Sequence, residues 1–232
     1  MGAEKAPERR TLMSKEREQI DISRYSYDEF VSFIFDRPPR PREGKYHPWY
    51  FDVEVTYDAA RVCEFYTRLF RDPDFLLEKY SKLQLEDGFW AIHGSAFDCS
   101  AFSIMWNEEL PFSARSECVR SMSQLFLRLF AKVTLETSVN MWWDSLCFEW
   151  ECGNRDRNRG GEDLAMQDVL FEILSGLLRS DSQACQDAAL HGLGHLHHPE
   201  TQKVIDAYLA EHPSLSKEAK AYALAAARFE IM

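Results

Sequence analysis

The sequence has little glycine and proline and no long apolar run, and these absences exclude several classes of protein. Its 232 residues include 10 glycines and 9 prolines, too few for a collagen-like or a Pro/Gly-rich low-complexity chain. No stretch of about 18 apolar residues is present, so we expect no transmembrane helix. The first 22 residues mix acidic and basic side chains without an apolar segment, unlike a secretory signal or a transit peptide. We therefore expect a cytoplasmic globular protein.

The six cysteines form no C-x-x-C pair, and no export signal accompanies them. A chain of this length can bury a hydrophobic core without disulfides. We therefore expect reduced thiols, most of them buried. The six residues are Cys63, Cys99, Cys118, Cys147, Cys152 and Cys185.

Positive charge is scarce as well, because 27 Lys and Arg residues stand against 38 Asp and Glu residues, a net charge of −11. An acidic surface repels phosphate backbones, so nucleic acid is not an expected partner. The densest basic cluster is Arg155, Arg157 and Arg159, in a segment (153–161) that has no apolar residue. We interpret this segment as a loop and a domain boundary, and its arginines as candidates for binding a partner.

Apolar residues recur with the helical period of about 3.6 over most of the chain. This period predicts helices over 26–35, 58–71, 85–92, 97–106, 113–132 and 139–150, another helix opened by Asp72 and Pro73, and four helices after Glu162. Ser26 and Glu29 have the spacing of a capping box at the first of them. Only 49–55 resembles a strand. We predict an all-α fold with a flexible tail (1–22), a helical N-terminal region (23–152), the loop (153–161) and a helical repeat region (162–232).

The repeat region aligns with itself when it is shifted by 34 residues, which places Leu170 on Val204 and Ala189 on Ala223. The run DAALHGLGHL at 187–196, followed by His-Pro-Glu-Thr at 198–201, resembles a HEAT-like repeat. His198 departs from the usual Asp before the proline, and the second copy ends at Met232 with no helix after it. The resemblance implies the terminal piece of an α-solenoid and a curved surface that binds proteins.

Histidines at 191, 195 and 198 suggest a metal site, because His191 and His195 lie one helical turn apart and Zn²⁺ accepts two such imidazoles. However, no glutamate lies between the pair, and all three histidines fall off the apolar stripe. Pro199 also biases His198 away from helical geometry. We therefore expect a solvent-facing polar row and no metal or other cofactor, with His191, His195 and His198 as the candidate ligands if a metal binds.

The aromatic content of 13% is high, and Trp142 and Trp143 are adjacent in one predicted helix. Neighbouring positions on a helix cannot point the same way. We favour a bulky core that takes both side chains. The alternative is that one of them is exposed and contacts a partner.

Two hypotheses for function follow. No G-x-S-x-G, P-loop or H-E-x-x-H pattern occurs, which favours a non-enzymatic module, an adaptor or an acidic immunity-type inhibitor, that binds a basic protein partner through a helical surface. The alternative is a metal-dependent hydrolase that uses His191 and His195. A test that distinguishes the two hypotheses is whether a carboxylate lies on the same face as His191 and His195. The sequence leaves the oligomeric state open.

Overall fold

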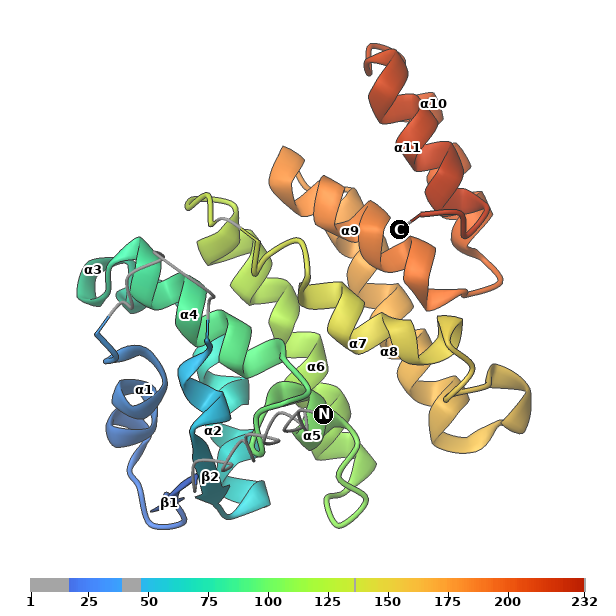
Figure 1. The fold of residues 1–232 in the computed structure, drawn as a ribbon. Helices are drawn as coiled ribbons and strands as arrows, with labels where there is room; N and C mark the ends of the chain where they lie inside the picture. Colours follow the sequence, from blue (N-terminus) through green and yellow to red (C-terminus); the bar gives the residue numbers. More distant parts are fainter. Residues whose placement is uncertain (1–16, 39–46, 136, 232) are drawn as a thin grey trace, which may run out of the picture.

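The computed structural model describes residues 17–38, 47–135 and 137–231. Within these ranges it contains eleven α-helices and a single sheet of two strands, so the prediction of an all-α fold with at most a minor strand is confirmed. The N-terminal elements lie at one end of the molecule and the two C-terminal helices, α10 (Thr201–Glu211) and α11 (Lys217–Ala227), at the other. Two helices, α6 (Phe112–Leu125) and α7 (Trp142–Glu151), lie between these ends (Figure 1). One continuous hydrophobic core joins the two ends, and it includes Phe30 of α1 and Ala226 of α11.

The sheet joins two segments that α1 (Tyr27–Phe35) separates along the chain. β1 (Glu18–Asp21) and β2 (Val53–Thr56) pair in parallel, with Ile20 opposite Val55. The flexible tail predicted over 1–22 is therefore wrong at its end, because pairing with β2 holds Glu18–Asp21 in a strand. Residues 1–16 lie outside the described residues.

The predicted strand over 49–55 is confirmed only in its second half. Its first residues form a 3-10 turn, η1 (Trp49–Phe51), and the strand β2 starts at Val53. Trp49 and Tyr50 of this turn are buried, and Trp49 packs edge-on against Phe97 and Phe33.

Side-chain caps start several of the helices where the sequence predicts them. Ser26 forms the capping box of α1 with Glu29, and Asp58 caps α2 (Ala59–Arg71). The helix expected to open at Asp72 is instead α3 (Phe75–Lys79), and Asp72 ends α2. The Asp72 carboxylate pairs with Arg128. This ion pair ties the end of α2 to the chain that follows α6.

The middle of the molecule is a stack of helices around aromatic side chains. After α4 (Lys82–His93) and α5 (Ala101–Met105) comes α6 (Phe112–Leu125), which a π-helical turn, η2 (Phe126–Phe130), extends. α7 (Trp142–Glu151) follows. Its Trp142 ring meets Phe89 and Phe130 edge-on in the core.

The C-terminal part consists of two helical hairpins. A short turn, η3 (Arg157–Arg159), leads into the hairpin of α8 (Gly161–Leu178) and α9 (Gln183–Leu196). The hairpin of α10 (Thr201–Glu211) and α11 (Lys217–Ala227) follows, and the Ser216 side chain caps α11. α9 packs against α7 on one side and α11 on the other. The four predicted helices are confirmed, and this packing brings α7, α9 and α11 together.

All six cysteines are free, and only Cys152 is exposed. The expectation of reduced, mostly buried thiols is therefore confirmed. None of the helices in the described part of the chain is long and apolar enough to cross a membrane.

Candidate metal centre

Two glycines bring α9 close to its neighbours. A Cβ atom on Gly192 would lie 2.7 Å from Leu174 Cδ2 and 2.8 Å from Trp143 Cβ, and one on Gly194 would lie 2.3 Å from Ile231 Cδ1. A larger residue at either position would push these elements apart. The close contact between α9 and α7 brings His191, which precedes Gly192, against Asp144 of α7.

Three side chains converge at this contact. The Oδ1 atom of Asp144 in α7 lies 3.0 Å from Nε2 of His195 and in close contact with Nε2 of His191. The three atoms lie within 4.8 Å of one another. All three atoms are buried, and among the described residues the two nitrogens pair with the same Asp144 oxygen. Two imidazole nitrogens and one carboxylate oxygen are ligand types that Zn²⁺ accepts.

The outer nitrogen of each imidazole contacts a further polar group. Nδ1 of His195 is in close contact with Oε2 of Glu151, and Nδ1 of His191 lies 2.6 Å from the hydroxyl oxygen of Tyr222 in α11. With the proton on Nδ1, each histidine donates to that oxygen and leaves the lone pair of Nε2 free. Metal-binding histidines commonly donate their other N–H to a carboxylate or another oxygen. The arrangement therefore suits a metal at Nε2 of both rings.

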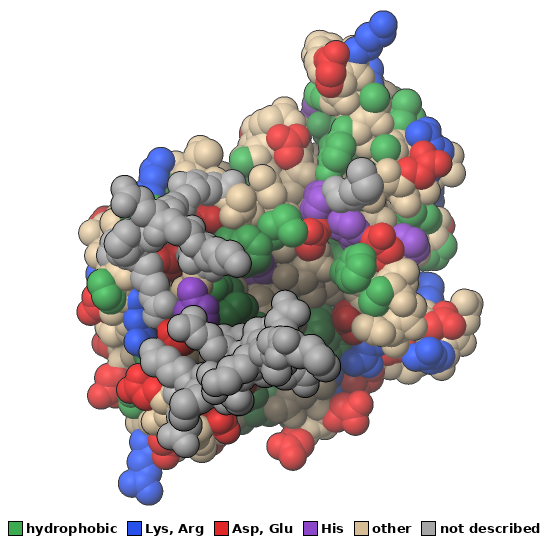
Figure 2. Space-filling model, viewed as in Figure 1, with side chains coloured by type: hydrophobic (Ala, Val, Ile, Leu, Met, Phe, Trp, Pro, Cys, Tyr) green, Lys and Arg blue, Asp and Glu red, His purple; other side chains and the backbone are tan. Residues whose placement is uncertain are grey.

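The centre is largely buried, contrary to the prediction of a solvent-facing histidine row. His195 is 5% exposed, and the side chain of His191 is 15% exposed. Burial raises the pKa of Asp144, but the two histidines outweigh burial and hold that pKa below its ordinary value. Figure 2 shows histidine side chains grouped on one face, with carboxylates and apolar side chains beside them. The prediction failed because α7 and α11 cover this side of α9.

His198 is not part of the convergence. α9 ends at Leu196, and the next residue, His197, has a left-handed backbone with φ of 54°. This turn directs His198 elsewhere: its Nε2 lies 3.0 Å from Oδ1 of Asp168, and its ring stacks on Phe171 at 3.8 Å. The expectation that Pro199 displaces His198 from the shared face is confirmed. The third candidate ligand is Asp144, which sequence spacing does not indicate.

The structure buries the two predicted partner-binding tryptophans and pairs the three predicted arginines with carboxylates. Trp142 and Trp143 are both fully buried, so the exposed-aromatic interpretation is wrong and the bulky-core interpretation is confirmed. The three loop arginines pair with carboxylates of α8: Arg155 and Arg159 with Asp163, and Arg157 with Asp168. These ion pairs hold the loop against α8.

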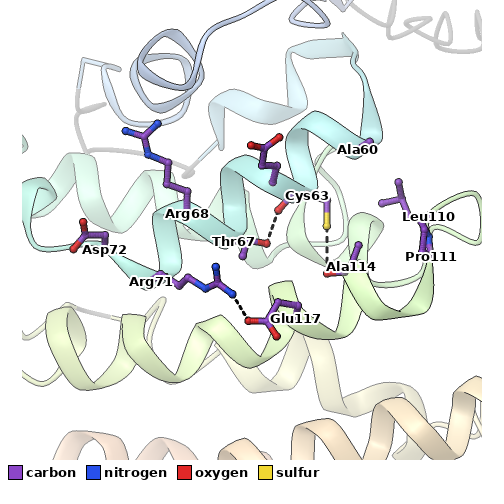
Figure 3. Close-up of a pocket in the computed structure, with 11 residues that line it drawn as sticks. Ala60, Cys63, Thr67, Arg68, Arg71, Asp72, Leu110, Pro111, Ala114 and Glu117 are labelled. Atoms are coloured by element: carbon purple, nitrogen blue, oxygen red, sulfur yellow. Dashed lines mark hydrogen bonds and ion pairs between the residues drawn. The ribbon is translucent and has the colours of Figure 1, made fainter.

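A cavity of about 470 Å³ between α2 and α6 is a second candidate site (Figure 3). Two of its polar side chains already have partners within its lining. The Cys63 thiol faces the carbonyl oxygen of Ala114 at 3.6 Å, and Arg71 pairs with Glu117 across the cavity. A hydrogen bond from Cys118 lowers the pKa of Cys63. No histidine lines the part of the cavity that the structure describes, so no Cys–His pair of the kind that activates a catalytic thiol is present there. The centre on α7 and α9 is the stronger candidate.

No family model, curated protein or solved structure matches the chain. A function can therefore be proposed only from the geometry of the site. The HEAT-like resemblance therefore stays a proposal. The hairpins α8–α9 and α10–α11 support it, because they pack in series through α9 and α11. Gly192 and Gly194 give the close helix contacts that small residues allow.

Proposed function

We propose that this protein binds a divalent metal ion, zinc by preference, through Asp144, His191 and His195, and uses a metal-bound water to hydrolyse its substrate. The observation that carries the proposal is the convergence of three buried ligand atoms on one point. The Asp144 carboxylate lies beside His191 and His195, and this is the feature that separates the hydrolase hypothesis from the interaction-module hypothesis.

The ligand set fits hydrolytic chemistry. Catalytic zinc sites have three protein ligands of the His and carboxylate type and keep the fourth position for water. An ion held by Asp144, His191 and His195 would lower the pKa of a bound water to about 7 and would so supply hydroxide for hydrolysis at neutral pH.

Glu151 and Tyr222 act through the histidines. Each contacts an Nδ1 atom, on the side of the imidazole that faces away from the ion. They fix the tautomer and the orientation of the rings, and they therefore set the affinity for the metal rather than contact the substrate.

Metal analysis tests the proposal. Protein purified without chelators should contain near one zinc per chain, and the chelator-treated protein should bind zinc with the same stoichiometry by calorimetry. Asp144→Ala and His195→Ala should each weaken binding by ~10–100-fold or more, because two remaining ligands make a weak site. His198→Gln is the matched control, since His198 is as buried as His195 but lies off the centre.

Three results would reject the proposal. One is equal zinc affinity in the wild type and in the Asp144→Ala variant with its fold intact by circular dichroism. A second is loss of binding in the His198→Gln control alone. The third is selective retention of iron, since two histidines and one carboxylate also form the iron site of oxygenases, and that result would replace hydrolysis by redox chemistry.

A protein-interaction role is a second candidate, and one observation favours it. Leu224 in α11 is 42% exposed, whereas Leu190, its counterpart 34 residues earlier in α9, is 3% exposed. The outer face of α11 is therefore open where the equivalent face of α9 is covered. Because this chain has a net charge of −11, we propose that a basic protein docks on this face. Leu224→Ser should abolish co-purification of such a partner, and Leu83→Ser, an equally exposed position in α4, should preserve it.

A further inference from the structure

We infer that the metal centre takes a neutral acyl compound, an ester or an amide, whose acyl group carries an apolar side chain, and that it rejects phosphate esters. This inference rests on the proposed metal centre and specifies its substrate class. Two features next to the histidines carry it: a rim of exposed aromatic side chains, and carboxylates that have no Lys or Arg partner in the described part of the chain.

Exposed aromatic rings lie against the histidines of this region. Phe148, one turn after Asp144 in α7, is 47% exposed, and its ring centroid is 6.1 Å from that of His195. Tyr222, which contacts His191, is 38% exposed. Exposed aromatic side chains beside a polar centre are typical of sites that bind apolar groups.

A third ring is held at the rim by an unusual backbone. Phe229 is 36% exposed and stacks on His197 with ring centroids 4.4 Å apart. Both residues have left-handed backbones, with φ of 59° and 54°. Such conformations cost free energy in residues other than glycine and persist where the surroundings enforce them, often at binding sites. The stacked pair therefore fixes an exposed aromatic ring on the histidine that lies two residues after His195 in the sequence.

The charges of the centre oppose an anionic substrate. Within the described residues, the ion-pair partners of Asp144 and Glu151 are histidines alone. Arg228, next to Phe229, is paired with Glu230 at 2.7 Å. The two carboxylates offset the charge of a divalent ion, so no positive charge remains to attract a phosphate dianion. Phosphoryl transfer relies on Arg or Lys at the phosphate oxygens, whereas a neutral carbonyl needs only the metal to polarise it.

Cobalt-substituted protein tests the inference by ligand binding. Co²⁺ replaces zinc, and its visible absorption bands shift when a ligand binds the ion. The protein is titrated with phenylacetohydroxamate, acetohydroxamate and inorganic phosphate; both hydroxamates chelate the metal, and only the first carries a phenyl group. We expect half-saturation by phenylacetohydroxamate at a concentration ~10-fold lower than by acetohydroxamate, because the ring packs on the aromatic rim. Phosphate at millimolar concentration should leave the bands unchanged.

Substitutions of the rim residues test which aromatic side chains cause the preference for the phenyl-bearing hydroxamate. Phe148→Ala and Phe229→Ala should each reduce the phenyl preference to ~3-fold or less. Phe51→Ala is the matched control, since Phe51 is 45% exposed in η1 and remote in sequence from the centre. Two rim positions are used so that poor folding of one variant does not decide the outcome.

The results separate this inference from the proposed function. Equal binding of the two hydroxamates, or binding of phosphate in preference to either, overturns the substrate class while the metal centre stands. Wild-type protein whose cobalt bands are absent, or are unchanged by Asp144→Ala, overturns the metal centre and the inference together.

Discussion

His93 should make the folded protein lose stability in mild acid. It lies at the end of α4 with 0% exposure, its ring between Trp90 and Trp142, and its Nδ1 3.0 Å from the hydroxyl of Ser145. Burial lowers its pKa from 6.5 to about 3, and the carboxylates of Glu86 and Asp144 offset only part of this effect. The folded state therefore keeps His93 neutral at a pH at which the unfolded chain binds a proton.

The magnitude follows from the two pKa values. Above pH 6.5 the side chain is neutral in both states and the free energy of unfolding is independent of it. As the pH falls from 7 to 5, the unfolded state alone gains the proton, which lowers the free energy of unfolding by about 2 kcal/mol. The loss continues to about 5 kcal/mol near pH 3, where the folded state is protonated as well.

Urea unfolding at pH 7, 6 and 5, with a chelator present to remove metal, measures this dependence. His93→Gln removes the titrating group and retains a polar partner for Ser145. The variant should be less stable at pH 7, because it fills the space between the two tryptophans less well, but its stability should fall by about 2 kcal/mol less than that of the wild type between pH 7 and 5. Parallel curves for the two proteins would refute the reasoning.

Further predictions concern the packing that builds the centre. Gly192→Ala should lower the free energy of unfolding by about 1–3 kcal/mol in urea titrations and weaken zinc binding, because its Cβ would clash with α7 and α8. Gly176→Ala is the control; a Cβ there meets nothing within 4 Å, so stability should be unchanged or rise by up to about 1 kcal/mol. Leu174→Ala, at a fully buried position of α8, should cost about 2–5 kcal/mol, and an unchanged thermal melt would contradict the packing of the hairpins. Deletion of residues 1–22 removes β1 and should lower the melting temperature relative to a deletion that stops at residue 16; equal melting would show that the parallel pair contributes nothing.

The helices were predictable because their signals are local. Ser26, Asp58 and Ser216 each accept a hydrogen bond from a backbone N–H three residues ahead, as their sequence neighbourhoods indicate. The strand β1 carried no such signal. Three of its four residues are exposed, so its sequence does not alternate between apolar and polar positions, and only pairing with β2 defines it.

The candidate metal centre was predictable only in part. The spacing of His191 and His195 identified two candidate ligands, since one helical turn joins them, although we expected no metal there. Asp144 was not identified, because a different helix supplies it. Glu151 of that helix and His195 of α9 are in contact although they are 44 residues apart along the chain. Burial was misjudged for the same reason: a face of α9 that is polar in sequence is covered by α7 and α11 in the fold.

The composition of this centre is easier to explain by ligand binding than by stability. Half-buried carboxylates and imidazoles are costly to remove from water, and apolar residues of similar volume would pack between α7 and α9 at lower cost. Side chains that lower stability in this way persist mainly where they have a function. A divalent ion would resolve the cost, because it takes the lone pairs of both Nε2 atoms and the charge of Asp144 at a single point. Since the ligands come from two helices, the ion would bind the folded chain in preference to the unfolded one and so stabilise the contact between α7 and α9.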